Sequence, residues 1–363
     1  MVKRDAGILA DADIAALFES GLLASPRSLD PDQIQPASLD LRLGAKAYRV
    51  RASFMPGPGT PVIDKLERLK LHEIDLTAGA VLETGCVYIV PLLESLALSP
   101  DLSASANPKS STGRLDIFTR VIADGAQEFD KVPAGYNGPL YLEVSPRTFP
   151  IVVRTGSRLS QIRFRKGRAQ LDEAELAALH KDETLVAAEM PNISGGGIAL
   201  SVDLTGGPDR LVGYRGKHHT AVVDVDKRAA HDVLDFWEPI YDRGARELVL
   251  DPDEFYILVS REAVHVPPLY AAEMTPFDPL VGEFRVHYAG FFDPGFGHSA
   301  AGGTGSRAVL EVRSHEVPFI LEHGQIVGRL VYEHMLHRPK ALYGLDLGSN
   351  YQAQQLKLSK HFR

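Results

Sequence analysis

The chain has 363 residues, of which 44% are hydrophobic and 24% are charged, as in ordinary globular proteins. This length predicts two or three domains, each able to bury a core of its own. The formal net charge of -8 argues against broad, sequence-independent binding to DNA or RNA, because such binding needs many Lys and Arg contacts to phosphates.

Cysteine usage and hydropathy indicate the compartment in which the protein is expected. The single cysteine, Cys86, excludes an internal disulfide. Nothing resembles a signal peptide, and no apolar run is long enough to span a bilayer. We therefore expect a cytoplasmic protein without a membrane partner.

The first half begins with a predicted helix and continues as β structure. Residues 11–23 carry apolar side chains at helical spacing, with Asp11 as the expected N-cap. From Pro36 onward apolar and polar residues alternate, and Pro and Gly separate the runs. The expected strands cover residues 37–43, 48–50, 87–90, 118–123, 140–144 and 151–154. Their spacing is typical of a β-sandwich or barrel-like fold.

The second half repeats the first. The tripeptide Leu-Glu-Val occurs at residues 142–144 and 310–312, and in both copies Pro follows the Glu after seven residues and Gly after thirteen. Residues 199–204 and 255–258 likewise repeat 37–41 and 87–90. This pattern indicates a tandem duplication. We expect an N-terminal domain over 1–168, a helical linker over 169–192, with its helix between Ala169 and Glu189, and a C-terminal domain over 193–363.

A polar run from Asn107 to Arg114 is the first motif that can carry chemistry. Its paired serines, Ser110 and Ser111, stand between two cations and can offer donors to phosphate oxygens. The same composition also suits a solvated turn, and the residues alone leave both interpretations open.

Glu143 and Glu311 each occupy an otherwise apolar strand. By alternation Glu143 shares a face with Tyr141, and Glu311 with Val309. Such a carboxylate either faces water or lies in a pocket, where loss of solvent raises its pKa into the range useful for proton transfer.

The sequence Asp293-Pro294-Gly295-Phe296-Gly297 predicts a turn after the run 286–292, and so a β-hairpin. Its backbone can read the edge of a base, or the hairpin is purely structural.

A zinc-dependent nucleobase deaminase is excluded, because one cysteine cannot supply the required Cys-x-x-Cys pair. The thirteen histidines are scattered and lack carboxylate or thiolate companions at ligand spacing, so we expect no bound zinc.

In combination, these motifs resemble the dCTP deaminase branch of the trimeric, dUTPase-like nucleotide hydrolases. The resemblance rests on residues 11–23, 34–44, 93–95, 109–114, 142–144, 193–332, Tyr343 and the tail 349–355. It implies a mainly β fold of two tandem dUTPase-like domains, each a β-clip or distorted jelly roll with short flanking helices, and a C-terminal lid.

The resemblance also implies the reaction. Family members hydrolyse dCTP to dUTP and ammonia, a step in dUTP and dTTP biosynthesis, without a catalytic metal. Mg²⁺ accompanies the triphosphate and is not held by protein side chains. We accordingly expect dCTP as the partner and a homo-oligomer as the assembly.

Residue roles carry over by position. The implied catalytic carboxylate is Glu143 or Glu311, and Ser110 and Arg114 hold the water and stabilise the tetrahedral intermediate. The implied substrate-binding residues are Lys109 and Ser111 at the phosphates, Ala123 and Ala289 at the base, and Tyr343 and Gln354 in the lid.

The sequence departs from the family pattern in both halves. Lys109 replaces an Arg and loses its bidentate fork, and Asn350 replaces a Lys of the lid. With Phe118 matched to Phe284, the second copy carries no serine pair or cation at the phosphate motif, where it has Pro276, Phe277 and Leu280. Nearby Asp278 and Glu283 would repel a triphosphate.

We therefore expect a composite site. The first half would supply the phosphate motif, and the second half would supply Ala289, Glu311, Tyr343 and Gln354. A site that uses Glu143 remains the alternative.

Two other functions stay open. A dUTP diphosphatase, or a bifunctional form that continues to dUMP and diphosphate, would use Asp130 or Asp293 to activate water. A catalytically silent nucleotide-binding module would explain the degenerate second copy.

Overall fold

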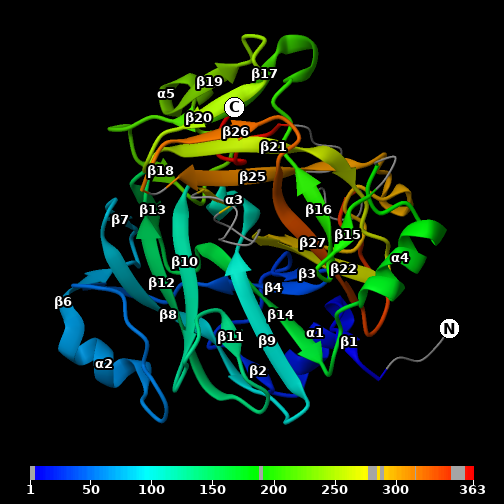
Figure 1. The fold of residues 1–363 in the computed structure, drawn as a ribbon. Helices are drawn as coiled ribbons and strands as arrows, with labels where there is room; N and C mark the ends of the chain where they lie inside the picture. Colours follow the sequence, from blue (N-terminus) through cyan, green and yellow to red (C-terminus); the bar gives the residue numbers. More distant parts are fainter. Residues whose placement is uncertain (1–4, 188–190, 277–283, 287–289, 315, 345–355) are drawn as a thin grey trace.

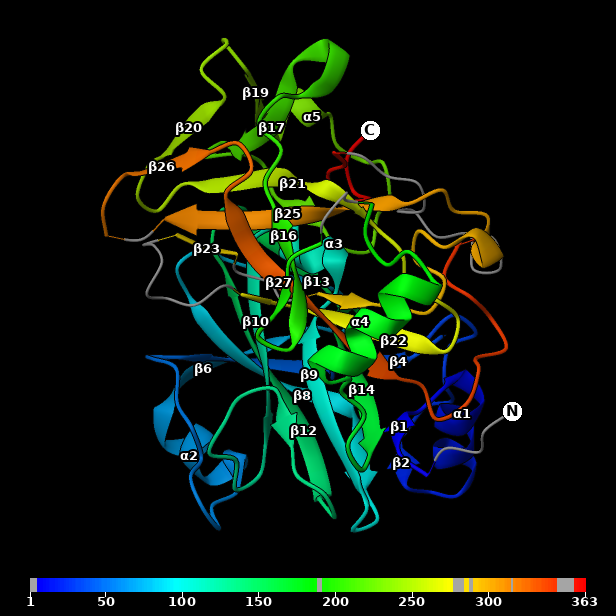
Figure 2. The same cartoon turned by 45° about the vertical axis from the view of Figure 1, so that its right-hand side comes forward.

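The computed structural model describes residues 5–187, 191–276, 284–286, 290–314, 316–344 and 356–363. It is mainly β and consists of two halves with the same strand order, which confirms the predicted fold class and duplication at this level. The first half, blue to green, fills the lower part of Figures 1 and 2, and the second half fills the upper part. Helix α3 (Ser110–Gly113) lies at their junction in both views.

Three sheets make up the first half. One sheet contains, in spatial order, β11 (Lys131–Val132), β9 (Leu102–Pro108), β14 (Arg158–Lys166), β4 (Ser38–Arg42) and β3 (Ile34–Gln35), with β1 (Gly7–Ile8) beside β14. A second contains β10 (Ile117–Ala123), β12 (Asn137–Pro146), β8 (Val87–Ala97), β5 (Lys46–Val50) and β6 (Lys70–Asp75), with β2 (Leu23–Ala24) beside β8. The small third sheet contains β7 (Ala80–Leu82), β13 (Ile151–Val153) and β18 (Val223–Asp224).

The second half repeats this arrangement. Its first sheet contains β24 (Phe291–Phe292), β22 (Tyr270–Pro276), β27 (Ile326–His334), β16 (Gly197–Ser201) and β15 (Ile193–Ser194). The other two contain β23 (Phe284–Val286), β25 (Ser306–Ser314), β21 (Phe255–Val264), β17 (Leu211–Gly216) and β19 (Trp237–Tyr241), and β20 (Glu247–Leu250) with β26 (Phe319–Glu322).

The register of the paired strands is the same in both halves. Glu143 lies opposite Ile89 and Glu311 lies opposite Ile257, while Pro108 faces Ser160 as Pro276 faces Gly328. Pro276 is thus the counterpart of Pro108. Matching Phe118 to Phe284, which put Pro276 at the place of Ser110, was therefore wrong by two residues at this point.

The helices within the described residues are short. They are α1 (Asp11–Glu19), α2 (Val62–Leu69), α3, α4 (Glu173–Asp182) and α5 (Val233–Phe236), with 3-10 turns η1 (Gly207–Asp209) and η3 (Ser299–Ala301). Helices α1 and α4 lie where the sequence predicted helices, whereas α2 was not anticipated. Asp11 is not the N-cap of α1: Ala10 is, and the Asp13 carboxylate accepts from its N–H at 3.0 Å.

The hairpin expected at the turn 293–297 does not form. Strand β24, before the turn, pairs with β22, whereas β25, the next strand, pairs with β21 and β23 in another sheet. Residues 287–289, in the run before the turn, lie outside the described part of the chain. The turn itself is present, with Gly295 and Gly297 at φ 99° and 65°.

The two halves share part of one core. Trp237 of the second half is fully buried and packs edge-on against Phe149 of the first, with ring centroids 5.2 Å apart. Phe362, near the C-terminus, joins this group at 5.8 Å from Trp237. Strand β18 also extends the first half's small sheet, in parallel with β13. These contacts fix the halves against each other.

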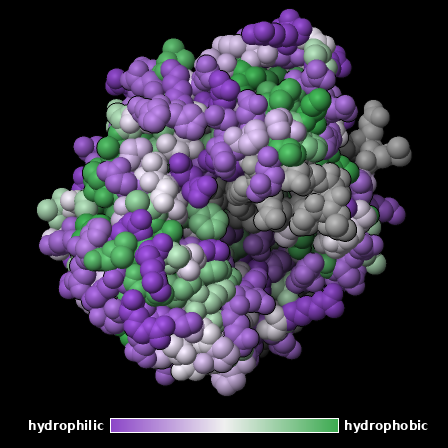
Figure 3. Space-filling view, turned by 60° about the vertical axis from the view of Figure 1, so that its left-hand side comes forward, coloured by the Kyte–Doolittle hydropathy of each residue, from purple (hydrophilic) through white to green (hydrophobic). Residues whose placement is uncertain are grey.

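Figure 3 shows a mostly hydrophilic face with scattered hydrophobic patches and a hollow beside the residues drawn in grey. None of the helices in the described residues is long and apolar enough to cross a membrane.

Candidate active site

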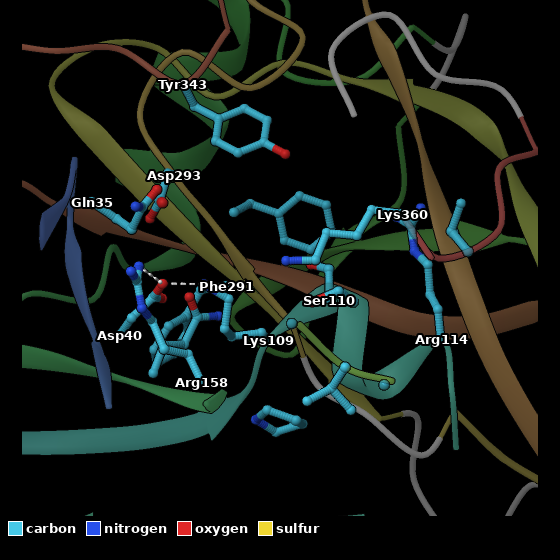
Figure 4. Close-up of a pocket in the computed structure, with 18 of the residues that line it drawn as sticks. Gln35, Asp40, Lys109, Ser110, Arg114, Arg158, Phe291, Asp293, Tyr343 and Lys360 are labelled. Carbon is cyan, nitrogen blue, oxygen red and sulfur yellow. Dashed lines mark hydrogen bonds and ion pairs between the residues drawn. The ribbon is translucent and has the colours of Figure 1, made fainter. Parts of the chain in front are cut away.

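A cavity of about 420 Å³ opens where the halves meet. The first half lines it with the end of β9, with α3 and with Arg158 of β14. The second half contributes β24, β25 and the segments around Asp226 and Lys360. Figure 4 shows the side chains of both halves converging on this space. The cavity therefore belongs to neither half alone.

The polar run predicted from the sequence forms one turn of helix rather than a solvated loop. Lys109 has an extended backbone, and its carbonyl accepts from Thr112 N–H at 2.8 Å and Gly113 N–H at 3.0 Å. Ser111 is buried, while Ser110 is half-buried and lines the cavity. The tight turn directly after β9 carries both serines to the cavity wall.

Arg114 follows this turn and lies against the second half. Its side chain is buried, and its Nε is 3.8 Å from Glu311 Oε1. Its Nη1 donates to the carbonyl of Lys357 at 2.9 Å. One guanidinium thus contacts both β25 and the C-terminal segment.

Glu311 lies in the middle of β25 and lines the cavity with Val309, on the same strand face as predicted. Burial raises its pKa to about 7, and the nearby Arg114 only partly offsets this rise. A carboxyl group with such a pKa can accept and return a proton near neutral pH.

Glu143 occupies the matching place in β12 but not in the cavity lining. It is 1% exposed, and its Oε1 accepts from Arg120 Nη2 at 2.6 Å and Nε at 2.9 Å. The Arg120 guanidinium also stacks 3.5 Å from the centroid of the Phe129 ring. Glu143 is therefore paired with Arg120, a cation of its own half. Its carboxylate neither faces water nor lines the cavity.

Charged residues line the side of the cavity near β4. Buried Asp40 pairs with Lys109 and accepts from Arg158 at 3.4 Å. Arg158 also pairs with Asp32 at 2.7 Å and Asp30 at 3.0 Å. Figure 4 shows Asp40 between the two cations.

The remaining predicted site residues differ in whether they line the cavity. Tyr343 lines the cavity. Ala123 is buried in the core of the first half, away from the cavity lining. Ala289 and Gln354 lie outside the described residues, although Gly290 and Phe291, directly after Ala289, line the cavity.

The two acids proposed for a diphosphatase also differ. Asp293 lines the cavity and contacts Arg163 at 3.2 Å, and burial raises its pKa. Asp130 is not among the lining residues, and its carboxylate accepts from the Val121 N–H at 2.7 Å. Burial raises the pKa of Asp130 to about 7.

Sequence reasoning missed several cavity residues. These are Asp40, Arg158, Arg228, Phe291 and Lys360. The sequence could have pointed to Asp40, because its Leu-Asp-Leu segment recurs in the second half as Val-Asp-Leu at 202–204. No such pattern points to Arg228 or Lys360, since only the folded chain brings them to α3.

Comparisons with known proteins cover both halves. Residues 5–168 match the 2'-deoxycytidine 5'-triphosphate deaminase N-terminal domain, and residues 172–362 match the C-terminal domain of the same family. The crystal structure of 2'-deoxycytidine 5'-triphosphate deaminase from Agrobacterium tumefaciens is similar, with 78% identity and a TM-score of 0.88, over 93% of this chain and 100% of that one.

Shorter relatives match about half of the chain. A dCTP deaminase from Haloarcula marismortui is 33% identical over 171 residues, which are 46% of this chain and 83% of the relative. A dUMP-forming dCTP deaminase from Dictyoglomus thermophilum is 33% identical over 165 residues, 44% and 80% of the two chains. With both domains matched over nearly its whole length, the chain belongs to the 2'-deoxycytidine 5'-triphosphate (dCTP) deaminase family of hydrolases.

Proposed function

We propose that the protein hydrolyses dCTP to dUTP and ammonia, and that Glu311 moves the protons. Family membership supports the reaction. The observation that carries the assignment of Glu311 is its position in the shared cavity, buried, next to Arg114 and with a pKa of about 7.

The chemistry needs one carboxylate with two successive tasks. Ionised Glu311 takes a proton from a water molecule as the water oxygen attacks C4 of cytosine. The carboxyl group then gives this proton to ring nitrogen N3. As the tetrahedral intermediate collapses, the proton of the new C4 hydroxyl passes through the Glu311 carboxylate to the amino nitrogen, the C4–N4 bond breaks, and ammonia leaves dUTP.

Ser110 and Arg114 would assist at the same atoms. Ser110 lines the cavity and can orient the attacking water by a hydrogen bond. The cation of Arg114, 3.8 Å from Glu311, favours the ionised carboxylate before the attack. Its charge also stabilises negative charge that develops on the intermediate.

Lys109 and Ser111 would contact the phosphates, with Tyr343 above them. Mg²⁺, where the triphosphate brings it, would supply charge neutralisation. No group of three or more His, Cys, Asp or Glu side chains in the described residues could hold a metal, and Asp40 is engaged by two cations.

Paired substitutions test the assignment. Glu311→Gln should reduce ammonia release from dCTP by about 10²–10⁴-fold, the usual contribution of a general acid–base, and leave dCTP binding measurable. Glu143→Gln is the matched control on the equivalent strand and should keep its turnover. Full activity in Glu311→Gln would overturn the assignment.

A bifunctional enzyme that continues to dUMP is the second candidate. Several relatives at 30–33% identity are named dUMP-forming, and Asp293 lines the cavity. Measuring the release of diphosphate alongside that of ammonia distinguishes the candidate functions. Release of ammonia alone supports the simple deaminase, and release of both products supports the bifunctional form. Release of no product supports a silent nucleotide-binding module.

We also propose that each half is a dUTPase-like β-clip, or distorted jelly roll, with the division at residues 1–168, 169–192 and 193–363. The repeated strand order supports this description. Self-association of the chain stays a prediction, for which sedimentation analysis is the test.

A further inference from the structure

The C-terminal segment 356–363 folds back onto the cavity wall. Ser359 Oγ donates to the carbonyl of Ser111 at 2.8 Å. The carbonyl of Lys357 accepts from Arg114 Nη1 at 2.9 Å. Two residues of the proposed catalytic and phosphate-binding set are therefore contacted by a segment that follows the predicted lid in the sequence.

Several contacts hold this segment in place. The carbonyls of Lys360 and His361 accept from Ala229 N–H at 3.0 Å and Ala230 N–H at 2.9 Å. A buried imidazole nitrogen of His361 lies 2.9 Å from the Val225 carbonyl. Phe362 packs into the aromatic group shared by the two halves. The backbone that carries Lys360 is thus fixed from both sides.

The Lys360 side chain extends from this backbone into the cavity toward Ser110 (Figure 4). It is half-buried. Arg228, from the loop after β18, lines the same cavity, and its side chain is exposed. Lysine and arginine are the side chains that proteins use to bind phosphate oxygens.

The electrostatic surroundings of Lys360 favour an anion. Burial and the positive charges of Lys109, Arg228 and Arg158 lower its pKa to about 8, and Asp40 opposes this only in part. Burial lowers the pKa of His361 to about 4, so His361 adds no charge near neutral pH. The other carboxylates on this wall are paired, Asp32 with Arg158 and Asp226 with Arg154. An anionic ligand would relieve the repulsion among these cations.

We propose that Lys360, together with Arg228, binds the polyphosphate of the nucleotide and makes the site selective for the triphosphate over the nucleoside. The inference rests on the proposed function, whose site it extends. It assigns Lys360 of the C-terminal segment and Arg228 of the loop after β18 to substrate recognition.

The test measures binding of inorganic tripolyphosphate and of deoxycytidine by calorimetry. Lys360→Met and Arg228→Met should each weaken tripolyphosphate binding by about tenfold or more, as expected for loss of one charge-assisted contact. Deoxycytidine binding should stay unchanged. In turnover, KM for dCTP should rise while kcat changes little.

Two neighbouring cations serve as matched controls. Lys227 is exposed and pairs with Asp224 at 3.3 Å, and Arg363 is exposed at the end of the chain. Neither lines the cavity. Lys227→Met and Arg363→Met should bind tripolyphosphate as the unaltered protein does. An equal loss in these controls would mean that general charge, and not Lys360, sets the affinity.

The pH dependence gives a second readout that a purely structural role would not produce. Above about pH 8 Lys360 loses its proton in the protein without ligand, so binding must take one up and weakens. The affinity advantage of the unaltered protein over Lys360→Met should therefore shrink from about pH 7 to about pH 9. Lys360→Arg should keep its advantage, because an arginine stays charged. An advantage of unaltered size at both pH values would contradict the proposal.

The two hypotheses fail in different ways. If Lys360→Met loses tripolyphosphate affinity while no variant releases ammonia from dCTP, the phosphate subsite stands and the proposed reaction falls. If ammonia is released with the same KM in Lys360→Met, the reaction stands and the subsite falls.

Discussion

Glu311 and Glu143 show how the surroundings of a residue decide its chemistry. Both face an isoleucine of the neighbouring strand at equivalent positions, and both are buried. Glu311 meets a cation from the other half across a cavity, at 3.8 Å. Glu143 meets Arg120 of its own half, at 2.6 Å. Only the first arrangement leaves a carboxylate beside space for a ligand.

The raised pKa of Glu311 predicts that its ionised form destabilises the folded protein at high pH. Its folded-state pKa of about 7 lies above the ordinary 4.5, so folding favours the protonated form. The stability it contributes is complete below about pH 4.5 and is lost as the pH rises through about 7. Glu311→Gln should then be more stable to urea than the unaltered protein at about pH 8, by about 1–3 kcal/mol, and equally stable at about pH 4.5. A gain of the same size at both pH values would contradict this account.

The Arg120–Glu143 pair predicts the opposite kind of effect. Arg120→Met keeps apolar contact with the Phe129 ring but leaves a carboxylate that is 1% exposed without its cation. Urea unfolding should show a loss of about 3–5 kcal/mol. Adding Glu143→Leu should recover most of it, because the unpaired charge is gone. A double variant as unstable as the single one would mean that lost packing, and not charge, is responsible.

At the scale of single elements, the turn after β24 carries Phe296 at the cavity, and its Pro294 carbonyl accepts from the N–H of Tyr343 at 2.8 Å. Gly297 has φ 65°, and a Cβ atom there would lie 2.1 Å from the Val264 carbonyl oxygen and 2.8 Å from the Ser306 nitrogen. Both neighbours are backbone atoms and cannot swing aside. The glycine is therefore required by space as well as by backbone conformation.

Gly297→Ala should lower the unfolding free energy by more than about 2 kcal/mol and reduce ammonia release. Gly21→Ala is the matched control, since Gly21 has φ 78° with nothing within 4 Å of an added Cβ. It should cost only about 1–2 kcal/mol and leave activity intact. Equal losses in the two variants would remove the steric part of the argument. Thermal unfolding and turnover of both variants decide between these outcomes.

Elements were predictable from the sequence where local pattern decides them. Alternation located β4, and the repeat located β21 and predicted that Glu143 and Glu311 would have equivalent places. Periodicity says nothing about which strands pair, so the hairpin expected at the turn 293–297 was wrong: β24 before the turn and β25 after it belong to different sheets. Arg228 and Lys360 escaped prediction because they approach α3 only through tertiary contacts.

At the scale of the whole molecule, the cavity depends on how the halves meet. Arg165 of β14 binds both oxygens of Glu333 in β27, at 2.6 and 2.9 Å, and reaches Glu273 of β22 at 3.4 Å. Arg163, on the same strand, is fully buried and contacts Asp293. One strand of the first half thus holds three carboxylates of the second half. We expect this contact to hold the halves in the arrangement that brings Arg114 of the first half next to Glu311 of the second.

A charge exchange across this contact tests whether the site needs the halves docked. Arg165→Glu would set a third carboxylate beside Glu333 and Glu273, which should cost about 3–5 kcal/mol in urea unfolding and greatly reduce ammonia release. Adding Glu333→Arg restores an opposite pair with residue 165 but sets a cation beside the buried Arg163, which lies 3.7 Å from Glu333, so it should recover only part of both. Lys46→Glu, at the exposed Lys46–Glu73 pair of the first half, is the control and should change neither measurably. If Arg165→Glu were destabilised but fully active, the site would not depend on this docking contact, because Arg114 and Glu311 come from opposite sides of it.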